Sequence, residues 1–218
     1  MSVRIHPTAI VEDGVEIGPG SAVWDNVHIR APASIGRDCI IGEKSYIAYG
    51  VAIGDRVKIN AFVYICTAVT IETGAMIAAG TIFTNDRYPR ATTPDLAALR
   101  ASEPDDETLP TLVREGATIG ARSVIGCDLE IGRFAMVGMG SVVTRSVPDF
   151  HLVAGHPART IGLVCRCGKR LRVGSDLVAL TPSELTCQAC SRHNRLEDVR
   201  VEEAGSLLRH DAAQRIAG

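Results

Sequence analysis

A repeat with a period of six residues restricts the fold of this chain more than any other feature of its sequence. Over residues 5–83 every sixth residue is large and apolar, and through Thr81 a small or β-branched residue stands four places after each of them. The large residues are Ile5, Val11, Ile17, Val23, Ile29, Ile35, Ile41, Ile47, Ile53, Ile59, Ile65, Ile71, Ile77 and Phe83. A helix repeats about every 3.6 residues and a strand every 2, so neither one amphipathic helix nor one flat strand buries this set. A chain that turns a corner every six residues does bury it, and the repeat therefore predicts a parallel β-helix built from hexapeptides.

The same phase returns after an interruption, at every sixth residue from Val113 to Val143. Glycine often follows the large residue, as at Gly36 and Gly54, and we attribute this to corners that need backbone freedom and to the close approach of neighbouring coils. Three hexapeptides, about eighteen residues, should complete each coil. We therefore predict an all-β fold, with a β-helix domain over residues 1–150 and a loop inserted over residues 84–112.

The composition is that of an ordinary folded protein and argues against several classes of partner. The 218 residues carry a net charge of -2, which gives no reason to expect nucleic acid or an anionic membrane as the main partner. No run of eighteen apolar residues occurs, and the first residues lack the apolar region of a secretion signal, so we expect a soluble, cytoplasmic protein. The 7 cysteines therefore favour reduced thiols or metal ligands over a disulfide framework.

The interruption at residues 84–112 is the first candidate for a functional element. Long loops inside compact repeats are uncommon unless they are functional or disordered. The first half of this loop carries polar groups suited to a ligand, whereas the stretch SEPDDETLP at residues 102–110 has the composition of a solvated surface. A short stretch, DLAALRA at residues 95–101, has a helical pattern. Because the interior of a β-helix is apolar, the chemistry must lie on outward positions and on this loop.

Four cysteines near the end of the chain form two closely spaced pairs, Cys165 with Cys167 and Cys187 with Cys190. Two such pairs resemble a zinc ribbon, in which four thiolates hold a tetrahedral ion between two hairpins, and a tail with free thiols is the alternative. Four cysteine ligands would close the coordination sphere, so we assign the predicted zinc a structural role and no catalytic one. The expected units beyond the β-helix are an exit segment at 151–164, a zinc-ribbon-like module at 165–190 and a charged tail at 191–218.

Several stretches together carry a resemblance to a known family. They are TNDRYPRA at residues 84–91, LVREGATIGARSVIG at 112–126, GSVVTRSVPDFHLVAGHPAR at 140–159 and the cysteine-bearing tail. With the repeat, they resemble bacterial left-handed β-helix N-acyltransferases. Among these, the chain is most similar to enzymes that acetylate the 3-amino group of nucleotide-linked 3-amino-3-deoxy sugars, such as UDP-2-acetamido-3-amino-2,3-dideoxyglucuronate N-acetyltransferases. The resemblance implies a left-handed prism, a homotrimer with active sites between adjacent prisms, acetyl-CoA as cosubstrate and no catalytic metal.

The resemblance also implies which residues meet the nucleotide-sugar acceptor. Asn85 matches the family asparagine beside the acceptor amine, where its side-chain carbonyl can accept an N–H bond and aim the nitrogen lone pair. Asp86, Tyr88 and Arg90 follow in the same motif, and Arg90 is suited to bind a diphosphate or a carboxylate of the acceptor. Histidine is the usual general base in related prisms, so His28 on an outward repeat position is the secondary catalytic candidate, with a solvated histidine as the alternative.

The later coils and the exit segment are expected to bind the acyl-CoA. Glycine and other small residues there let the pantetheine approach the backbone, and the arginines match basic positions that meet CoA phosphates in similar enzymes. A solvated surface charge is the alternative for each arginine. The residues concerned are Gly138, Gly140, Ser141, Arg145, His156, Pro157 and Arg159.

Other functions compete with this hypothesis. A γ-class carbonic anhydrase, which also uses this prism, needs three histidines around zinc, and residues 35–140 contain none. Acylation of a dTDP-linked 3-amino-6-deoxy sugar, or transfer of a longer acyl chain, is not separated from a UDP-linked acceptor by any residue of the sequence. From another class, a non-catalytic trimeric scaffold or a nucleic-acid-binding zinc ribbon would use the same features, although the ribbon lacks aromatic residues for stacking bases.

Overall fold

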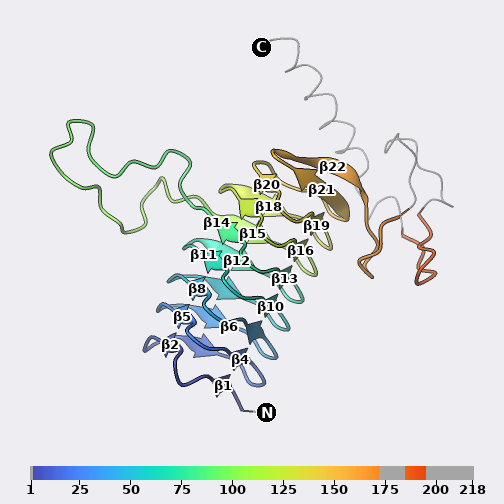
Figure 1. Ribbon diagram of the computed structural model, residues 1–218, viewed down its shortest axis with the longest axis horizontal. Coiled ribbons are helices and arrows are strands. Elements are labelled where there is room, and N and C mark those ends of the chain that lie inside the picture. Colours follow the sequence, from blue (N-terminus) through green and yellow to red (C-terminus); the bar gives the residue numbers. More distant parts are fainter. Residues whose placement is uncertain (1, 172–184, 195–218) are drawn as a thin grey trace, which may run out of the picture.

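The structure, a computed structural model, describes residues 2–171 and 185–194. This part of the chain winds into a parallel β-helix whose three sheets form the sides of a prism (Figure 1). From β1 to β21, neighbouring strands of each sheet pair in parallel and lie one coil apart, as Ile5 does with Val23, eighteen residues later. The pairing confirms three hexapeptides per coil. The predicted all-β solenoid is also confirmed, and the described residues contain no helix.

Each side of the prism is one sheet, which we name A, B or C. Sheet A contains β1 (Arg4–Ile5), β4 (Ala22–Val23), β7 (Ile40–Ile41), β10 (Lys58–Ile59), β13 (Met76–Ile77), β16 (Thr118–Ile119), β19 (Met136–Val137), β21 (His151–Gly155) and β22 (Ala158–Leu163). Sheet B contains β2 (Ile10–Val11), β5 (His28–Ile29), β8 (Tyr46–Ile47), β11 (Tyr64–Ile65), β14 (Ile82–Phe83), β17 (Val124–Ile125) and β20 (Val142–Val143). Sheet C contains β3 (Glu16–Ile17), β6 (Ser34–Ile35), β9 (Ala52–Ile53), β12 (Val69–Ile71), β15 (Thr111–Val113) and β18 (Leu129–Ile131).

The repeat positions fill the interior as the sequence predicts. From the second coil on, the large residue of each repeat points inward and is buried, as at Ile29 and Ile65, and the small residue four places on completes the filling, as at Ala75. The first coil is covered from one side only, so Val11 and Ile17 are partly buried and Ile5 is 48% exposed. One continuous cluster of buried side chains runs through the prism up to Val153.

The glycines that follow the large residues serve close packing between coils, and the corner conformation falls elsewhere. At Gly42 a side-chain carbon would lie 2.5 Å from the backbone carbonyl carbon of Asn60 in the next coil. The left-handed conformation comes two residues later, at Lys44 with φ of 57°, and at the equivalent Asn26 and Phe62. The expectation that these glycines provide backbone freedom is therefore wrong, whereas the expected close approach of coils is confirmed.

We expect Gly42→Ala to destabilise the protein by about 1–3 kcal/mol, the usual cost of forcing extra atoms into a packed site. The opposing backbone of Asn60 is itself hydrogen-bonded to the following coil at Ile77, so it cannot shift alone. Urea-induced unfolding measures the difference in the free energy of unfolding. Gly74→Asn is the matched control, because its φ of 73° suits asparagine and the nearest atom to an added carbon is 4.0 Å away. A Gly42 variant as stable as this control would contradict the packing argument.

The loop replaces one corner of the β-helix. The chain leaves sheet B at the end of β14 and returns in sheet C as β15, which pairs with β12 below it, so the repeat resumes in register. Figure 1 shows the loop projecting away from the prism. Within it, residues 95–101 form turns, and Thr92 bridges Leu99. The helical pattern expected there is wrong, because Leu96 has a φ of 62°, which a right-handed helix does not allow.

Beyond β20 the chain adds a hairpin and a cysteine-bearing module. β21 continues sheet A in parallel with β19, and β22 returns antiparallel to β21. A second, smaller core forms around Phe150 and Leu163. The division into an exit segment and a zinc-ribbon-like module stays a prediction. Residues 172–184 of that module and residues 195–218 of the charged tail lie outside the described residues.

Candidate active site

The loop stands on the B–C edge, the corner where each coil passes from sheet B to sheet C. Two contacts fix the base of the loop to the prism and close it on itself. Arg87 pairs with Asp128 of the next coil at 2.7 Å, and the backbone N–H of Leu109 donates to the carbonyl of Asn85 at 2.8 Å. Asn85 is consequently held at the base of the loop, half-buried beside the prism.

The other predicted acceptor residues follow Asn85 outward along the loop. The Asp86 carboxylate accepts a hydrogen bond from the backbone N–H of Tyr88 at 2.7 Å, which forms a tight turn. Tyr88 is 76% exposed, and Arg90 is exposed as well. Further along, the Tyr49 hydroxyl of the prism donates to the backbone carbonyl of Ser102 at 3.3 Å. The structure thus gathers all four predicted acceptor residues on one loop, with Tyr88 and Arg90 open to solvent in a single chain.

His28 lies on the same sheet as the base of the loop but far along it. Its strand β5 is three strands from β14, so at a strand spacing of about 4.8 Å it lies about 14 Å from the strand that precedes Asn85. The His28 Nε2 is 3.1 Å from the Glu12 carboxylate, which also pairs with Arg30. A hydrogen bond from the backbone N–H of Ala31 lowers the pKa of Glu12, and both His28 and Arg30 lower it further. Within one chain, therefore, the two predicted catalytic residues do not meet.

The outer face of sheet B carries a ladder of large side chains, of which the sequence analysis singled out His28 and missed the others. Tyr46 and Tyr64 stack with ring centroids 5.3 Å apart, and His28 meets Tyr46 edge-on. Tyr64 and Ile82 are each 44% exposed, and Ile10 is 58% exposed. Each of these residues directly precedes the large residue of its repeat, and each lies eighteen places from the next, so a search at that spacing would have found them. Sheet B therefore carries exposed apolar side chains on its outer face.

All but one of the predicted acyl-CoA residues meet near the A–B edge, where each coil passes from sheet A to sheet B. Gly138, Gly140 and Ser141 form this edge in the last coil, and among the described residues none but the chain neighbours of Gly140 lies within 4 Å of a side-chain carbon added there. The turn between β21 and β22 holds the exposed His156 and Pro157. Arg159 stands on β22.

Arg145 is the exception, because it follows β20 and so lies across sheet B, on the B–C edge.

Small residues continue the A–B edge through the coils below. The sequence analysis missed them, although these residues occupy equivalent positions of the repeat. We name this surface the small-residue track; it consists of residues 78–80, 120–121 and 138–140, all of them alanine or glycine except the exposed Met139. It runs along one corner of the prism over three successive coils.

The four cysteines predicted as zinc ligands come together in space. Their Sγ atoms all lie within 4.8 Å of one another. The Sγ atoms of Cys165 and Cys190 are 3.7 Å apart, and those of Cys167 and Cys187 are 3.6 Å apart. Four sulfurs each about 2.3 Å from a tetrahedral zinc ion would be about 3.8 Å apart. The arrangement therefore fits a structural zinc site.

The pKa values of two of these thiols, Cys187 and Cys190, are shifted in opposite directions. Hydrogen bonds from the backbone N–H groups of Ala189 and Cys190 lower the pKa of Cys187 to about 7. A backbone hydrogen bond at Arg192 also lowers the pKa of Cys190, but hydrogen bonds with the other thiols outweigh it and raise this pKa to about 12. Four thiolates in so small a space need a cation between them. Zinc would be held by all four sulfurs, with no coordination position left for a substrate.

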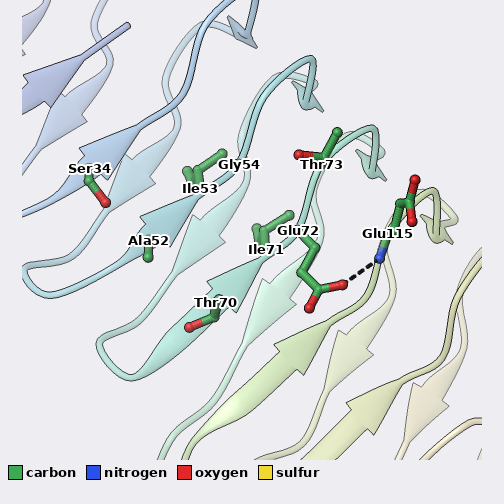
Figure 2. A pocket seen from close by; sticks show the side chains of 9 residues that line it. All are labelled: Ser34, Ala52, Ile53, Gly54, Thr70, Ile71, Glu72, Thr73 and Glu115. Carbon is green, nitrogen blue, oxygen red and sulfur yellow. Dashed lines mark hydrogen bonds between the residues drawn. The ribbon is translucent and has the colours of Figure 1, made fainter.

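A groove of about 590 Å³ lies on sheet C, and Figure 2 shows the side chains that line it. The face is hollowed because its outward residues Ser34, Ala52 and Thr70 are small. At its rim the Glu72 carboxylate accepts a hydrogen bond from the backbone N–H of Glu115 at 2.9 Å, drawn as the dashed line in Figure 2. The groove includes none of the residues predicted from the sequence as catalytic, substrate-binding or cofactor-binding.

Comparison with known proteins agrees with the architecture. The family model described as the hexapeptide repeat of succinyl-transferase matches residues 32–67 and 110–145, on both sides of the loop. The dTDP-3-amino-3,6-dideoxy-alpha-D-galactopyranose 3-N-acetyltransferase of Aneurinibacillus thermoaerophilus is 42% identical over 89 residues, which are 41% of this chain and 43% of that protein. Serine acetyltransferase of Escherichia coli K12 is 32% identical over 141 residues, or 65% of this chain and 40% of that enzyme. The chain thus spans less than half the length of these curated relatives.

Among solved structures, a mutant of AntD, an N-acyltransferase from Bacillus cereus in complex with dTDP and coenzyme A, aligns with a TM-score of 0.49 at 22% identity, covering 76% of this chain and 85% of that chain. The repeat match and the coiled sheets define the class: this chain is a hexapeptide-repeat β-helix protein.

Over the described ranges, the structure has no helix of the length and apolarity that crossing a membrane requires.

Proposed function

We propose that this protein is an acyl-CoA-dependent N-acyltransferase that acetylates the 3-amino group of a nucleotide-linked 3-amino-3-deoxy sugar. The observation that carries the proposal is its 42% identity, over 89 residues, to a 3-N-acetyltransferase of such a sugar. We assign the acceptor to the loop around Asn85 and the acyl donor to the small-residue track. The two surfaces lie at opposite edges of sheet B, so donor and acceptor approach from different corners.

The reaction is the attack of a sugar amine on a thioester carbonyl. The neutral amine forms the C–N bond, the C–S bond breaks, and the departing thiolate takes up the proton that the amine loses. An amine beside electron-withdrawing oxygens should titrate near the α-amino range of about 7.7–8.0, so a neutral fraction exists at neutral pH without a strong base. In this proposal the Asn85 side-chain carbonyl accepts one N–H bond of the amine and so aims its lone pair at the thioester carbon.

We further propose a homotrimer in which sheet B of each copy faces the threefold axis. The exposed side chains of Ile10, Tyr64 and Ile82 form an apolar stripe that three copies would cover together. When three prisms turn the same face inward, the A–B edge of each copy lies beside the B–C edge of the next. The small-residue track of one copy would then border Asn85 of its neighbour, so a complete site needs two chains.

The donor has a defined direction in this arrangement. Residues 78–80 of the track lie in the same coil as Asn85, and residues 138–140 lie two coils above, about 10 Å along the axis. With the phosphates of CoA near Arg159 and the turn at His156, the pantetheine would run down the track toward the coil of Asn85. The thioester would thereby reach the acceptor amine at the edge between two copies.

A panel assay tests the proposal and identifies the acceptor. Acetyl-CoA consumption is measured with UDP- and dTDP-linked 3-amino sugars, each with and without a C6 carboxylate, and with the matching 3-hydroxy sugars as controls. Turnover of at least one amino sugar, with none of the controls, is the expected result. The dTDP-linked sugars test the second candidate function, acylation of a dTDP-linked 3-amino-6-deoxy sugar, because the relative from Aneurinibacillus is named for a dTDP-linked 6-deoxy sugar. Failure of every amino sugar and of longer acyl donors would overturn the proposal.

If the acceptor carries a carboxylate, Arg90→Ala should raise KM for the acid more than for its neutral analogue, by roughly tenfold for a charged hydrogen-bonded pair. Arg90 is exposed on the loop, so its removal should not disturb the prism. Steady-state kinetics with both acceptors measure the two values. Arg133→Ala, a change at a surface arginine of the C–A edge, serves as the control. An equal rise in KM for the acid and for the neutral sugar would contradict recognition of the carboxylate by Arg90.

A further inference from the structure

The cysteine module shares its core with the end of the β-helix. The members of this second core are Phe150, Leu163, Cys165, Leu171, Leu185 and Cys187, with Phe134 packed against them. Cys165 and Cys187 are 1% and 2% exposed, so two of the four sulfur ligands lie inside an apolar cluster. The zinc site is consequently part of the packing at this end of the protein.

The hairpin β21–β22 is anchored in this core, where β21 begins and β22 ends. Phe150 directly precedes β21, and Leu163 is the last residue of β22. The backbone N–H of Val164 donates to the carbonyl of Phe150 at 2.8 Å, and that of Leu171 donates to the carbonyl of Leu163 at 2.9 Å. One end of the hairpin is therefore in direct contact with the cysteine module, while β19 pairs with β21 along its length.

The opposite end of the hairpin touches the small-residue track. The backbone N–H of Gly138 donates to the carbonyl of Val153 at 2.7 Å, and the backbone N–H of Gly155 donates to Ser141 Oγ at 3.3 Å. A side-chain carbon at Gly138 would lie 2.9 Å from Cβ of Ala154, so the two backbones are in close contact. A shift of the hairpin would move one wall of the surface assigned to the acyl donor.

Arg166 joins the cysteine module to the prism from the side. Its guanidinium lies 4.6 Å from the ring centroid of Phe134 and 5.9 Å from that of Phe150. The two rings stack with centroids 5.6 Å apart at 15°, so the arginine covers an aromatic pair that spans the last coil and the start of the hairpin.

From these contacts we infer that the four-cysteine centre is a positioning element for the acyl-donor surface. Zinc in the centre holds the module, the module holds the hairpin through its second core, and the hairpin forms the upper wall of the small-residue track. The metal takes no part in the chemistry, yet its loss weakens the binding of CoA. This inference rests on the proposed function in its reference to CoA, whereas the link between the centre and the hairpin stands on the contacts alone.

The test uses the full chain and the double variant Cys167→Ser, Cys190→Ser, which changes the two exposed members of the cluster. Zinc content is measured by atomic absorption, CoA affinity by calorimetry and hairpin opening by hydrogen exchange of the amides of residues 151–163. The expected result is loss of zinc, at least tenfold weaker CoA binding and faster exchange in the hairpin, with exchange in the lower coils unchanged. Zinc loss with unchanged CoA affinity and unchanged hairpin exchange would overturn the inference.

A second variant keeps the inference falsifiable if the double variant does not fold. Arg166→Ala retains all four cysteines and should keep its zinc, while hairpin exchange becomes faster and CoA binds several-fold more weakly. Lys169→Ala is the matched control, because Lys169 is an exposed cation of the same turn and should behave as the wild type. Exchange in the Arg166 variant equal to that of the control would overturn the coupling. A wild-type protein that does not bind CoA would instead contradict the proposed function, and hydrogen exchange would still decide the coupling.

Discussion

Replacing Asn85 by alanine should lower kcat by at least tenfold, or about 1.4 kcal/mol of transition-state stabilisation, while the assembly persists. The variant loses the carbonyl oxygen that we propose aims the amine lone pair. It keeps the structural contact of this position, because Leu109 donates to the backbone carbonyl of Asn85, which alanine also has. Steady-state kinetics at saturating concentrations of both substrates measure kcat, and light scattering reports the mass of the assembly.

Two further variants make the result specific to the amide. Asn85→Asp retains an acceptor oxygen at nearly the same place, so it should keep more activity than the alanine variant. Asp106→Ala removes an exposed polar side chain from the same loop and should leave kcat at the wild-type value. An alanine variant at position 85 with the full kcat would remove Asn85 from the mechanism.

The architecture was predictable because one constraint recurs in every coil. The inward position at Ile29, Ile47 and Ile65 must be filled each time the chain goes round, so a single period predicts both the strands and the core. The same argument predicted that the repeat resumes after the loop, since the first strand beyond the loop must again place its large residue in the interior. A turn such as that at Leu96 is set by local hydrogen bonds instead, and a helical pattern of apolar residues did not foresee it.

The candidate site was less predictable, because a period of six separates inside from outside without assigning positions to sheets. Residues that share a sheet recur every eighteen places, and only at that spacing do Tyr46, Tyr64 and Ile82 form one ladder. The distance between His28 and Asn85 has the same origin, since the strand of His28 and the strand that precedes Asn85 belong to one sheet but to different coils. The cysteine cluster was predictable from its spacing, whereas its shared core with Phe150 depends on contacts that no local pattern contains.

Two variants that each have little activity should restore it when their subunits are combined in one trimer. Asn85→Ala removes the proposed acceptor group, and Gly140→Phe blocks the small-residue track. The second change should fold, because Gly140 has open space around it and Phe62 has φ of 59° at the equivalent corner of another coil. If each site joins the track of one copy to the loop of the next, a co-expressed mixture contains some sites with both halves intact.

The expected recovery follows from how equal numbers of the two subunits distribute. A site is intact when the copy that supplies the track carries the Asn85 change and the copy that supplies the loop carries the Gly140 change. Each condition is met half of the time, so about one quarter of the sites, and of the wild-type kcat per subunit, should return. Pre-formed trimers of each variant, mixed under conditions that prevent exchange, are the control and should stay inactive. Co-expressed subunits that also stay inactive would show that Asn85 and Gly140 serve one site within a single chain, because no mixed trimer could then contain an intact site.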